Sequence, residues 1–246
     1  MLSSTSKVYV FDDVDSTQNV VKAAFSEGAK EGYAVRAKRQ SSGRGRYSRV
    51  WQGGEGNFLF SVLLRPRADL SQASQISFVA VNSVYDAVVE FAGEDVGEDL
   101  KIKWPNDLLL SGKKLSGILL EVENDKDGYG IVLGVGVNLV QAPEEGISLK
   151  SRFDGLDCNA DRFTEIFMKQ LAKNYQQWQD YGFETVRERW IERSGAIGQN
   201  VLVRLADEEF SGTVSDFDKD GALVLVSDVD QTTRRITAGD VFYQPS

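Results

Sequence analysis

Three extended segments follow one another closely in the middle of the chain and constrain its fold more than any other feature. They cover Lys101–Leu110, Lys114–Glu123 and Tyr129–Leu139. The stretches between them are short and rich in turn-forming residues, Ser111-Gly112 and Asp125–Gly128. Because a chain that reverses direction within a few residues places successive strands side by side, this spacing predicts an antiparallel meander.

Apolar residues at helical spacing predict helices that cover this sheet. Ser71–Phe91 and Asp161–Tyr181 are amphipathic, and a shorter helix is expected over Phe183–Arg193. Asn57–Leu64 is almost entirely apolar, which is typical of a strand buried on both faces. The segment Val140–Asp161 shows no period, and we expect it to be a mobile or ligand-ordered loop.

The character of the sequence changes near Gly198, where short strand-like runs separated by turn residues begin. A unit of about fifty residues is close to the lower size limit for independent folding, so we expect it to pack on the rest of the chain. The sequence therefore predicts an α+β domain over residues 1–195, with a mixed or antiparallel sheet flanked by helices. A small C-terminal β-barrel is expected over residues 196–246.

The composition excludes several kinds of chemistry. There is no histidine and a single cysteine, Cys158, which removes Ser-His-Asp and Cys-His catalysis and His-ligated zinc. One cysteine forms no internal disulfide, which fits a reducing compartment. No apolar run reaches the roughly 18 residues that a membrane span needs, and the N-terminus lacks the pattern of a secretory signal. We therefore expect a cytoplasmic protein whose chemistry uses Lys, Arg, carboxylates, amides or a bound hard cation.

The segment Ser41–Trp51 is the first candidate site, because it contains Arg44, Arg46 and Arg49 together with two glycines. Glycine lets successive backbone N–H groups converge on one point, and guanidinium groups bring positive charge and forked donors to it. The chain as a whole has a net charge of -9. This local positive charge therefore indicates a small-anion site, such as one for a polyphosphate or an acyl phosphate, and not a nucleic-acid surface. A solvated loop is the alternative.

Two further strings place polar groups beside strands. Lys103–Asp107 reads K-W-P-N-D, and a hairpin after it would bring Lys103 and Asp107 close to Lys114. An Asp beside an Asn suits Mg²⁺ held mainly by phosphates and water, and a lysine suits a phosphate or carboxylate oxygen. Gly134–Asn138 reads G-V-G-V-N, where small residues allow a ligand to approach the backbone. A polar turn and a bulge are the alternatives for these two strings.

These strings occur in an order that resembles the biotin–protein ligases (biotin–acetyl-CoA-carboxylase ligases). The matching strings are D-S-T-Q, Q-S-S-G-R-G-R-x-x-R-x-W, K-W-P-N-D-L followed by K-L-S-G-I-L-L-E, and G-V-G-V-N-L, spread over residues 15–139. The C-terminal β unit also looks like that of the family. The resemblance implies a ligase domain similar to class II synthetases, followed by an SH3-like β-barrel. Lipoate ligases share the fold of the first domain.

The resemblance implies an ATP-dependent reaction in two steps. The biotin carboxylate attacks the α-phosphate of ATP, with Mg²⁺ present, giving biotinyl-5′-AMP and pyrophosphate. A lysine of a biotin carboxyl carrier domain, in acetyl-CoA carboxylase or a related carboxylase, then attacks the mixed anhydride and releases AMP. Neither step needs histidine. A lipoate or octanoate ligase of the same fold is the alternative within this chemistry, and a non-catalytic biotin-sensing module is the alternative outside it.

The resemblance also implies roles for individual residues. Those expected to contact biotin are Ser16, Thr17, Gln18, Gln40, Gly43, Arg44 and Lys114. Those expected to contact the nucleotide are Arg44, Gly45, Arg46, Arg49, Trp51, Lys103, Asn106 and Asn138. Lys114 and Arg46 are the expected catalytic residues, and Asp107 is the expected Mg²⁺ ligand. Gln18 departs from the family, where asparagine is commoner after the threonine. Ser16 and Thr17 also suit a helix N-cap, which is compatible with binding.

Three further expectations follow from the resemblance. The first matching string begins at Asp15, which leaves no room for the N-terminal DNA-binding domain of the repressor members, so we expect a monofunctional ligase that contacts neither DNA nor membrane. Family members often pair through sheet edges, which makes a homodimer possible. Some members cover the adenine with a tryptophan after the G-x-G-x-N string. Here Gln141–Leu149 contains no aromatic residue, so the sequence does not identify the residue that covers the adenine.

Overall fold

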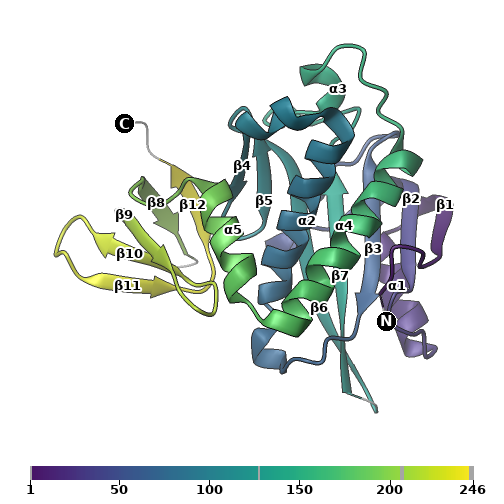
Figure 1. Cartoon of the computed structure of the whole chain (residues 1–246), viewed down its shortest axis with the longest axis horizontal. Helices are drawn as coiled ribbons and strands as arrows, with labels where there is room; N and C mark the ends of the chain where they lie inside the picture. Colours follow the sequence, from purple (N-terminus) through teal and green to yellow (C-terminus); the bar gives the residue numbers. More distant parts are fainter. Residues whose placement is uncertain (1, 127, 206–207, 244–246) are drawn as a thin grey trace.

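The computed structural model describes residues 2–126, 128–205 and 208–243, and within these residues the strands form two sheets. The larger has seven strands in the order β1-β2-β3-β7-β6-β5-β4 (Figure 1). Its strands are β1 (Val8–Val14), β2 (Ala34–Gln40), β3 (Phe58–Leu64), β4 (Leu100–Lys103), β5 (Asp107–Leu110), β6 (Lys113–Asp125) and β7 (Gly128–Val137). β1 and β2 are parallel and the other neighbours are antiparallel, so the sheet is mixed, as predicted.

The predicted meander is present, because β5, β6 and β7 pair in chain order and antiparallel. The expectation that Lys101–Leu110 forms one extended segment is wrong. Two short strands, β4 and β5, pair with each other on either side of a turn at Trp104–Asn106. Pro105, in a cis peptide with Trp104, has no N–H for a ladder, which is why the pairing stops there. Lys103 and Asp107 pair directly across this turn, so their side chains lie on the same face of the sheet at its edge.

Helices cover both faces of the large sheet. The helices are α1 (Thr17–Ser26), α2 (Gln75–Ala92), α3 (Leu149–Arg152), α4 (Ala160–Tyr181) and α5 (Glu184–Ser194), with 3-10 turns at Arg46–Ser48, Leu70–Gln72 and Glu94–Glu98. α2 and α4 lie side by side on one face (Figure 1), where Phe58 and Phe60 of β3 pack edge-on against the ring of Phe167. α1 lies on the opposite face, where Val21 and Phe25 pack with side chains of β2, β3 and β7. None of the helices in the described residues is both long and apolar enough to cross a bilayer.

Most of Val140–Asp161 is loop, and the expectation of a loop is wrong only for one short helix. Its mobility and its ordering by a ligand stay predictions. The segment contains α3, whose N-terminus is closed by reciprocal hydrogen bonds between Ser148 and Ser151. Just before it, the N–H of Ile147 donates to the carbonyl of Lys114 at 3.0 Å, and Gly146 bridges to the same residue. Serine capping of a single helical turn leaves no periodic apolar signal, so this helix could not be predicted from the apolar pattern.

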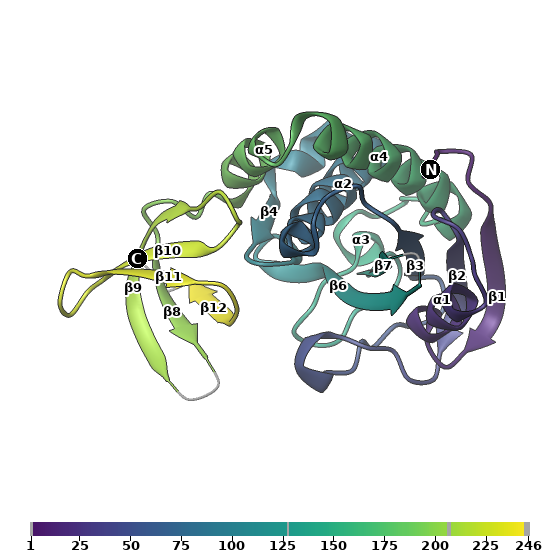
Figure 2. The same ribbon diagram turned by 90° about the horizontal axis from the view of Figure 1, so that it is seen from below.

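The smaller sheet follows α5 and has the order β11-β10-β9-β8-β12 among the described residues. Its strands are β8 (Asn200–Arg204), β9 (Glu209–Phe217), β10 (Leu223–Ser227), β11 (Thr233–Ile236) and β12 (Asp240–Tyr243). Figure 2 shows it at one end of the molecule, beside β4 and α5. Phe217 packs edge-on against Trp190 of α5, with ring centroids 4.4 Å apart. The indole N–H of Trp104 donates to the carbonyl of Gly221 at 3.0 Å, so the small sheet contacts the turn between β4 and β5 directly.

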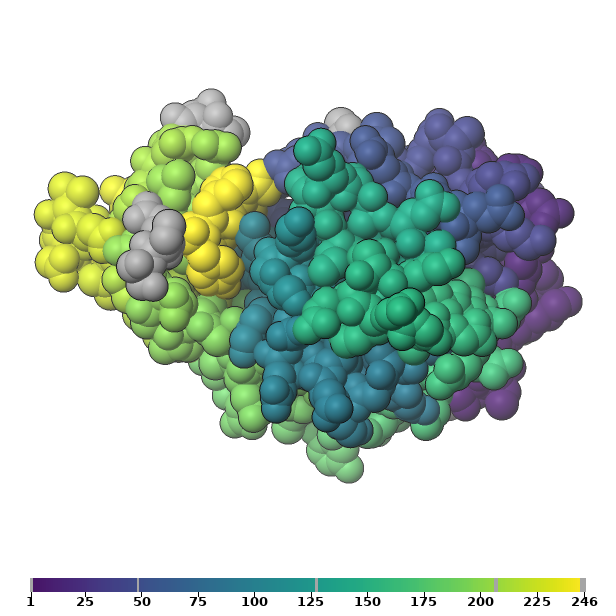
Figure 3. Space-filling model, turned by 90° about the horizontal axis from the view of Figure 1, so that it is seen from above, coloured from purple at the N-terminus to yellow at the C-terminus, as the bar shows by residue number. Residues whose placement is uncertain are grey.

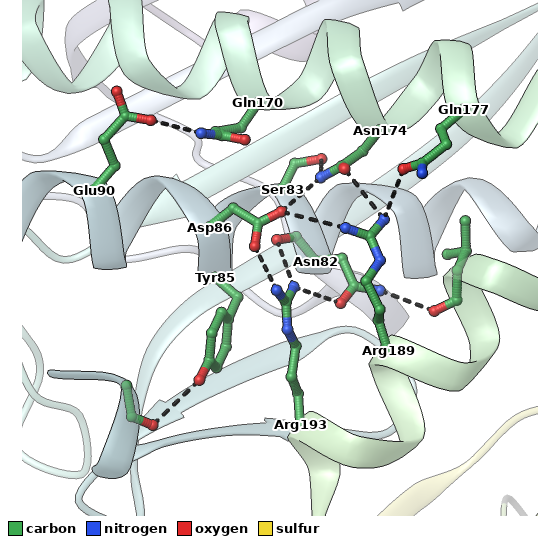
Figure 4. Close-up of polar contacts among 12 residues, drawn as sticks. Asn82, Ser83, Tyr85, Asp86, Glu90, Gln170, Asn174, Gln177, Arg189 and Arg193 are labelled. Atoms are coloured by element: carbon green, nitrogen blue, oxygen red, sulfur yellow. Dashed lines mark hydrogen bonds and ion pairs between the residues drawn. The ribbon is translucent and has the colours of Figure 1, made fainter. Parts of the chain in front are cut away.

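A polar cluster holds α5 in place against α2 and α4 (Figure 4). Arg193 of α5 donates to Asp86 of α2 at 2.5 Å and to Asn82 Oδ1 at 2.8 Å. Arg189 donates to Asn174 of α4 at 3.2 Å. Burial lowers the pKa of Arg189, although the nearby Asp86 opposes this shift. Since α5 leads directly into β8, this cluster fixes the direction from which the small sheet approaches the large one. The domain boundary at residues 195/196 stays a prediction.

Candidate active site

A cavity of about 540 Å³ opens where the N-terminus of α1, the Ser41–Trp51 loop, the turn after β4 and strand β12 come together. All of the predicted site residues except Gly43 line it. The space-filling view shows the end of the chain, in yellow, lying against the larger part of the molecule (Figure 3). The lining therefore brings together residues of D-S-T-Q, the Ser41–Trp51 loop, K-W-P-N-D and G-V-G-V-N, four strings that are far apart in the sequence.

Gly43 has a structural part in this arrangement. The N–H of Trp51 donates to the carbonyl of Gly43 at 3.1 Å, and a Cβ added to Gly43 would lie 2.4 Å from the carbonyl oxygen of Trp51. Because that distance is too short for any side chain, glycine is required for the two ends of the loop to meet. The contact of Gly43 with biotin stays a prediction.

Buried hydroxyl and amide groups at the start of α1 are hydrogen-bonded within the protein. Ser16 caps the helix, accepting from the N–H of Gln18. The hydroxyl oxygens of Ser61 and Thr17 are 2.8 Å apart, and Thr17 donates onward to Gln40 Oε1 from its hydroxyl at 3.1 Å and its N–H at 2.7 Å. Ser16 and Thr17 are at most 3% exposed. This end of the cavity is therefore fixed by bonds within the protein itself.

The arginines of the Ser41–Trp51 loop each contact a different part of the fold. Arg44 pairs with Glu121 of β6. Arg46 donates to Asn106 Oδ1 at 3.2 Å, within the K-W-P-N-D string. Arg49 pairs with Asp240 of β12, and the Asp240 hydrogen bond raises the pKa of Arg49.

Two lysines and one carboxylate converge at the edge of the large sheet. Lys114 Nζ lies 2.7 Å from Asp107 Oδ1, on the neighbouring strand, so the predicted proximity of these residues is confirmed. Burial lowers the pKa of Lys103, and the charge of Lys114 adds to this effect while Asp107 opposes it. Lys103 Nζ also lies 5.3 Å from the ring centroid of Phe242. Such a concentration of positive charge beside one carboxylate is suited to binding an anion.

The indole of Trp51 lies over two glycines of adjacent strands. Gly117 of β6 and Gly136 of β7 are directly paired, and a Cβ on Gly136 would be 2.3 Å from the Trp51 ring. Side chains alternate between the faces of a strand, so Gly134 and Gly136 lie on the face opposite Val135, which is part of the core under α2. The absent side chains leave the space that Trp51 and the cavity occupy. The role of Trp51 toward a nucleotide stays a prediction.

Asn138 both supports Lys114 and offers an oxygen that nothing in the described residues uses. Its Nδ2 donates to the carbonyl of Lys114 at 3.4 Å, and its Oδ1 is buried without a hydrogen-bond partner. Asp107 and this amide oxygen are the kind of ligands that Mg²⁺ takes when phosphates and water supply the rest. The described residues contain no group of three His, Cys, Asp or Glu side chains that could hold a metal. A carboxylate and an amide oxygen in the cavity lining fit a cation that enters together with a phosphate.

Sequence reasoning missed several residues that line the cavity or support its lining. Those in the lining include Ser61, Gly117, Pro143, Glu145, Gly146, Arg204, Asp240 and Phe242. Glu121, which pairs with Arg44, was also missed. The L-S-G string after Lys114 was a usable signal for Gly117. No sequence signal pointed to Asp240, because its partner Arg49 lies 191 positions away in the chain.

Comparison with known proteins decides the family. The model of the biotin/lipoate A/B protein ligase family matches residues 10–138, and the model of the biotin protein ligase C-terminal domain matches residues 196–243. The biotin–[acetyl-CoA-carboxylase] ligase of Paracoccus denitrificans is 33% identical, with 93% of this chain and 97% of that protein covered. This chain belongs to the biotin/lipoate A/B protein ligase family.

Other members of the ligase family agree with this placement. The bifunctional ligase/repressor BirA of Bacillus subtilis is 30% identical over 94% of this chain and 72% of its own length. The solved structure of the biotin protein ligase from Aquifex aeolicus in complex with biotin and ATP superimposes with a TM-score of 0.81. Its identity is 26%, and the match covers 98% of this chain and 99% of that one. The predicted α+β fold with an SH3-like C-terminal unit is therefore confirmed.

Proposed function

We propose that this protein is a biotin–[biotin carboxyl-carrier protein] ligase, which activates biotin with ATP and transfers it to a lysine of a carrier domain. The observation that carries the proposal is the convergence of four separate strings on one cavity, with Lys114 and Asp107 in contact inside it. The naming of the Paracoccus relative and the biotin and ATP bound to the Aquifex structure support the same reading.

Lys114 is the central catalytic residue of the proposed mechanism. In the first step its ammonium binds the biotin carboxylate and holds it in line with the α-phosphate of ATP. In the second step the same ammonium faces the carbonyl oxygen of the mixed anhydride, on which negative charge develops as the acceptor lysine attacks. Because the backbone of Lys114 is fixed by Asn138 and Ile147, this charge needs little rearrangement during the reaction.

The cationic groups at the other end of the cavity bind the phosphates. Arg46 approaches the acyl phosphate from the loop, and Lys103, Arg49 and Asn106 surround the rest of the anion. Each arginine already has an amide or carboxylate partner, which phosphate oxygens replace when ATP binds. Asp107 and Asn138 would hold Mg²⁺, which would neutralise phosphate charge when bound.

Ser16, Thr17, Gln18 and Gln40 bind the biotin head group at the α1 end of the cavity. Lipoate ligation is less well supported, although the family model includes lipoate ligases. The match to the C-terminal domain of biotin protein ligases favours biotin, as do the polar groups at the α1 end, since a dithiolane ring has no donor or acceptor comparable to a urea. The acceptor is a biotin carboxyl carrier domain, and whether two copies of the chain pair during transfer stays a prediction.

The proposal is tested by following both half-reactions. Purified protein with biotin, ATP and Mg²⁺ should form biotinyl-5′-AMP, detected by mass spectrometry, and release one pyrophosphate for each molecule of adenylate. Addition of a carrier domain should then give a single biotinylated lysine and free AMP. Replacing biotin with lipoate provides the control. Folded protein that forms no biotinyl-AMP, or that forms the lipoyl adenylate more rapidly, would contradict the proposal.

A further inference from the structure

Two glutamine side chains at the α1 end of the cavity are held with their amides in opposite orientations. Gln40 turns its oxygen toward Thr17, whose backbone N–H lies 2.7 Å away. A backbone N–H can only donate, so the atom that faces it must be the carbonyl oxygen of the amide. The other branch of the Gln40 amide, its Nε2, therefore lies beside Gly43, where it is a hydrogen-bond donor.

Gln18 has the reverse orientation. Its amide contacts Glu121 Oε2 at 3.0 Å and the carbonyl of Val132 at 3.3 Å. A carboxylate and a carbonyl both only accept, so the atom between them must be Nε2. The other branch of the Gln18 amide, its Oε1, then lies next to Gly134. It is buried and has no hydrogen-bond partner in the described residues. Both Gln18 and Gly134 line the cavity.

A buried acceptor without a donor costs free energy, and such an atom calls for an explanation. A ligand N–H against the floor of the cavity would satisfy it. Gln40 offers a donor in the same part of the cavity. The two amides together therefore present one acceptor and one donor whose directions are set before any ligand arrives.

Glu121 sets the direction of Gln18. Its carboxylate on β6 accepts from Gln18 Nε2, from Lys22 Nζ at 2.8 Å and from Arg44. Turning the Gln18 amide around would place Oε1 against this carboxylate, and two acceptors facing each other at that distance repel. Glu121 thus excludes the orientation in which Gln18 would offer a donor to the cavity.

We propose that Glu121 is a positioning residue that orients Gln18 as an acceptor for a substrate N–H. The oppositely oriented amides of Gln18 and Gln40 then select head groups that carry an N–H next to a C=O, as a cyclic urea does, over rings that have neither. This inference rests on the proposed function, and it assigns the choice between a urea and a dithiolane to one pair of side chains and their carboxylate.

The test measures binding of three ligands to wild type and to variants. Biotin and dethiobiotin both contain the cyclic urea, and lipoate has no N–H in its ring. Gln18→Met keeps the length of the side chain and removes the amide. We expect the Kd values of biotin and dethiobiotin to rise together by roughly 10- to 100-fold, as expected for loss of a buried hydrogen bond. The Kd of lipoate should change by less than about twofold, because it makes no such bond.

The positioning role is tested at Glu121 itself. Glu121→Ala should weaken biotin binding at least as much as Gln18→Met, because it also releases Arg44 and Lys22. The double variant should be no worse than Glu121→Ala alone, because the contact between Gln18 and Glu121 is already lost. Glu121→Gln should keep most of the biotin affinity, since its Oε1 still accepts from Gln18. The matched control is Glu123→Ala, two residues along the same strand. Glu123 shares Lys22, at 2.9 Å, without contacting Gln18, and its loss should leave all three Kd values unchanged.

The possible outcomes are distinct. Three results would each overturn the inference. They are an equal rise in the Kd of all three ligands in Gln18→Met, additive changes in the biotin Kd in the double variant, and loss of biotin binding in Glu121→Gln. Thermal unfolding and ATP binding, measured on the same samples, identify a variant that has merely lost its fold. A wild-type protein that binds neither biotin nor dethiobiotin contradicts the proposed function instead. A wild type that binds biotin while Gln18→Met binds it equally well contradicts this inference alone.

Discussion

The two ends of the cavity hold their polar groups in different ways. At the α1 end, Ser16, Thr17 and Gln18 are at most 3% exposed, and Thr17 is bonded to neutral partners. At the loop end, the side chain of Arg49 is 62% exposed and pairs with a carboxylate of another element. Thr17 at one end is held by buried hydrogen bonds, whereas Arg49 at the other end is held by an exposed ion pair.

The difference indicates how the two substrates are recognised. A buried hydrogen bond is costly to leave unmade, so the α1 end keeps one shape with or without a ligand. An exposed ion pair contributes little, at most about 1 kcal/mol, and can be exchanged for a phosphate oxygen at small cost. The head group therefore meets a preformed surface, whereas the phosphates complete their own site by replacing the partners of the arginines.

Lys114 lies between the two ends, and its removal should have the largest effect. Lys114→Ala should lower the rate of biotinyl-AMP formation about 10³-fold, or about 4 kcal/mol, since it removes a charge that stabilises the developing anion. Pyrophosphate release measures the change. Lys113→Ala, the adjacent exposed lysine of β6, is the matched control and should be close to wild type. A loss of less than tenfold in the rate of biotinyl-AMP formation in Lys114→Ala would mean that the reaction does not need the Lys114 charge between the two ends.

Thr17→Val tests the buried end. Valine keeps the shape of threonine but cannot join Ser61 to Gln40, so we expect the KM for biotin to rise about tenfold, roughly 1.4 kcal/mol, with the KM for ATP within about twofold. Steady-state kinetics with each substrate varied in turn checks this split. Thr164→Val, at a buried threonine of α4 that bonds the carbonyl of Ala160, controls for stability. An equal rise in both KM values would show that the ends are not independent.

Asp240→Asn tests the exposed end and should have the smallest effect. Loss of the pair with Arg49 should change the KM for ATP by only about two- to threefold, and the change should shrink as salt is added. The KM for biotin should stay constant. Glu208→Gln is the control, because Glu208 forms an exposed pair with Arg234 of β11 in the small sheet. A tenfold effect that persists at high salt would contradict the comparison, because it would require a pair shielded from solvent.

The sequence predicted the parts of the site whose chemistry is contained in short strings. K-W-P-N-D places Lys103 and Asp107 across one turn, and the hairpin that follows brings Lys114 to them, so local spacing was sufficient. The apolar run of β3 and the amphipathic α2 and α4 were predicted for the same reason, since burial shows directly in the pattern.

Contacts made between distant segments could not be predicted. Glu121 is part of a strand whose alternation explains it without any role, and only the folded sheet shows that it faces Gln18 and Arg44. Lys114 is fixed from behind by Gly146 and Ile147, in a segment whose short helix depends on two serines and not on an apolar stripe. The contribution of β12 depends on how the small sheet packs against Trp190 and Trp104, which no local pattern encodes.

The pairing of Arg49 with Asp240 has a consequence for how the enzyme is made. Ribosomes deliver the chain from its N-terminus, and domains generally fold as they emerge. The large sheet can therefore assemble with every ligase motif in place while β12 is still to be synthesised. Until that strand arrives, the phosphate side of the cavity has no wall on the side of Asp240. A chain truncated just before β12 would keep every ligase motif of the large sheet, but it would lack this wall of the cavity and the edge strand that pairs with β8.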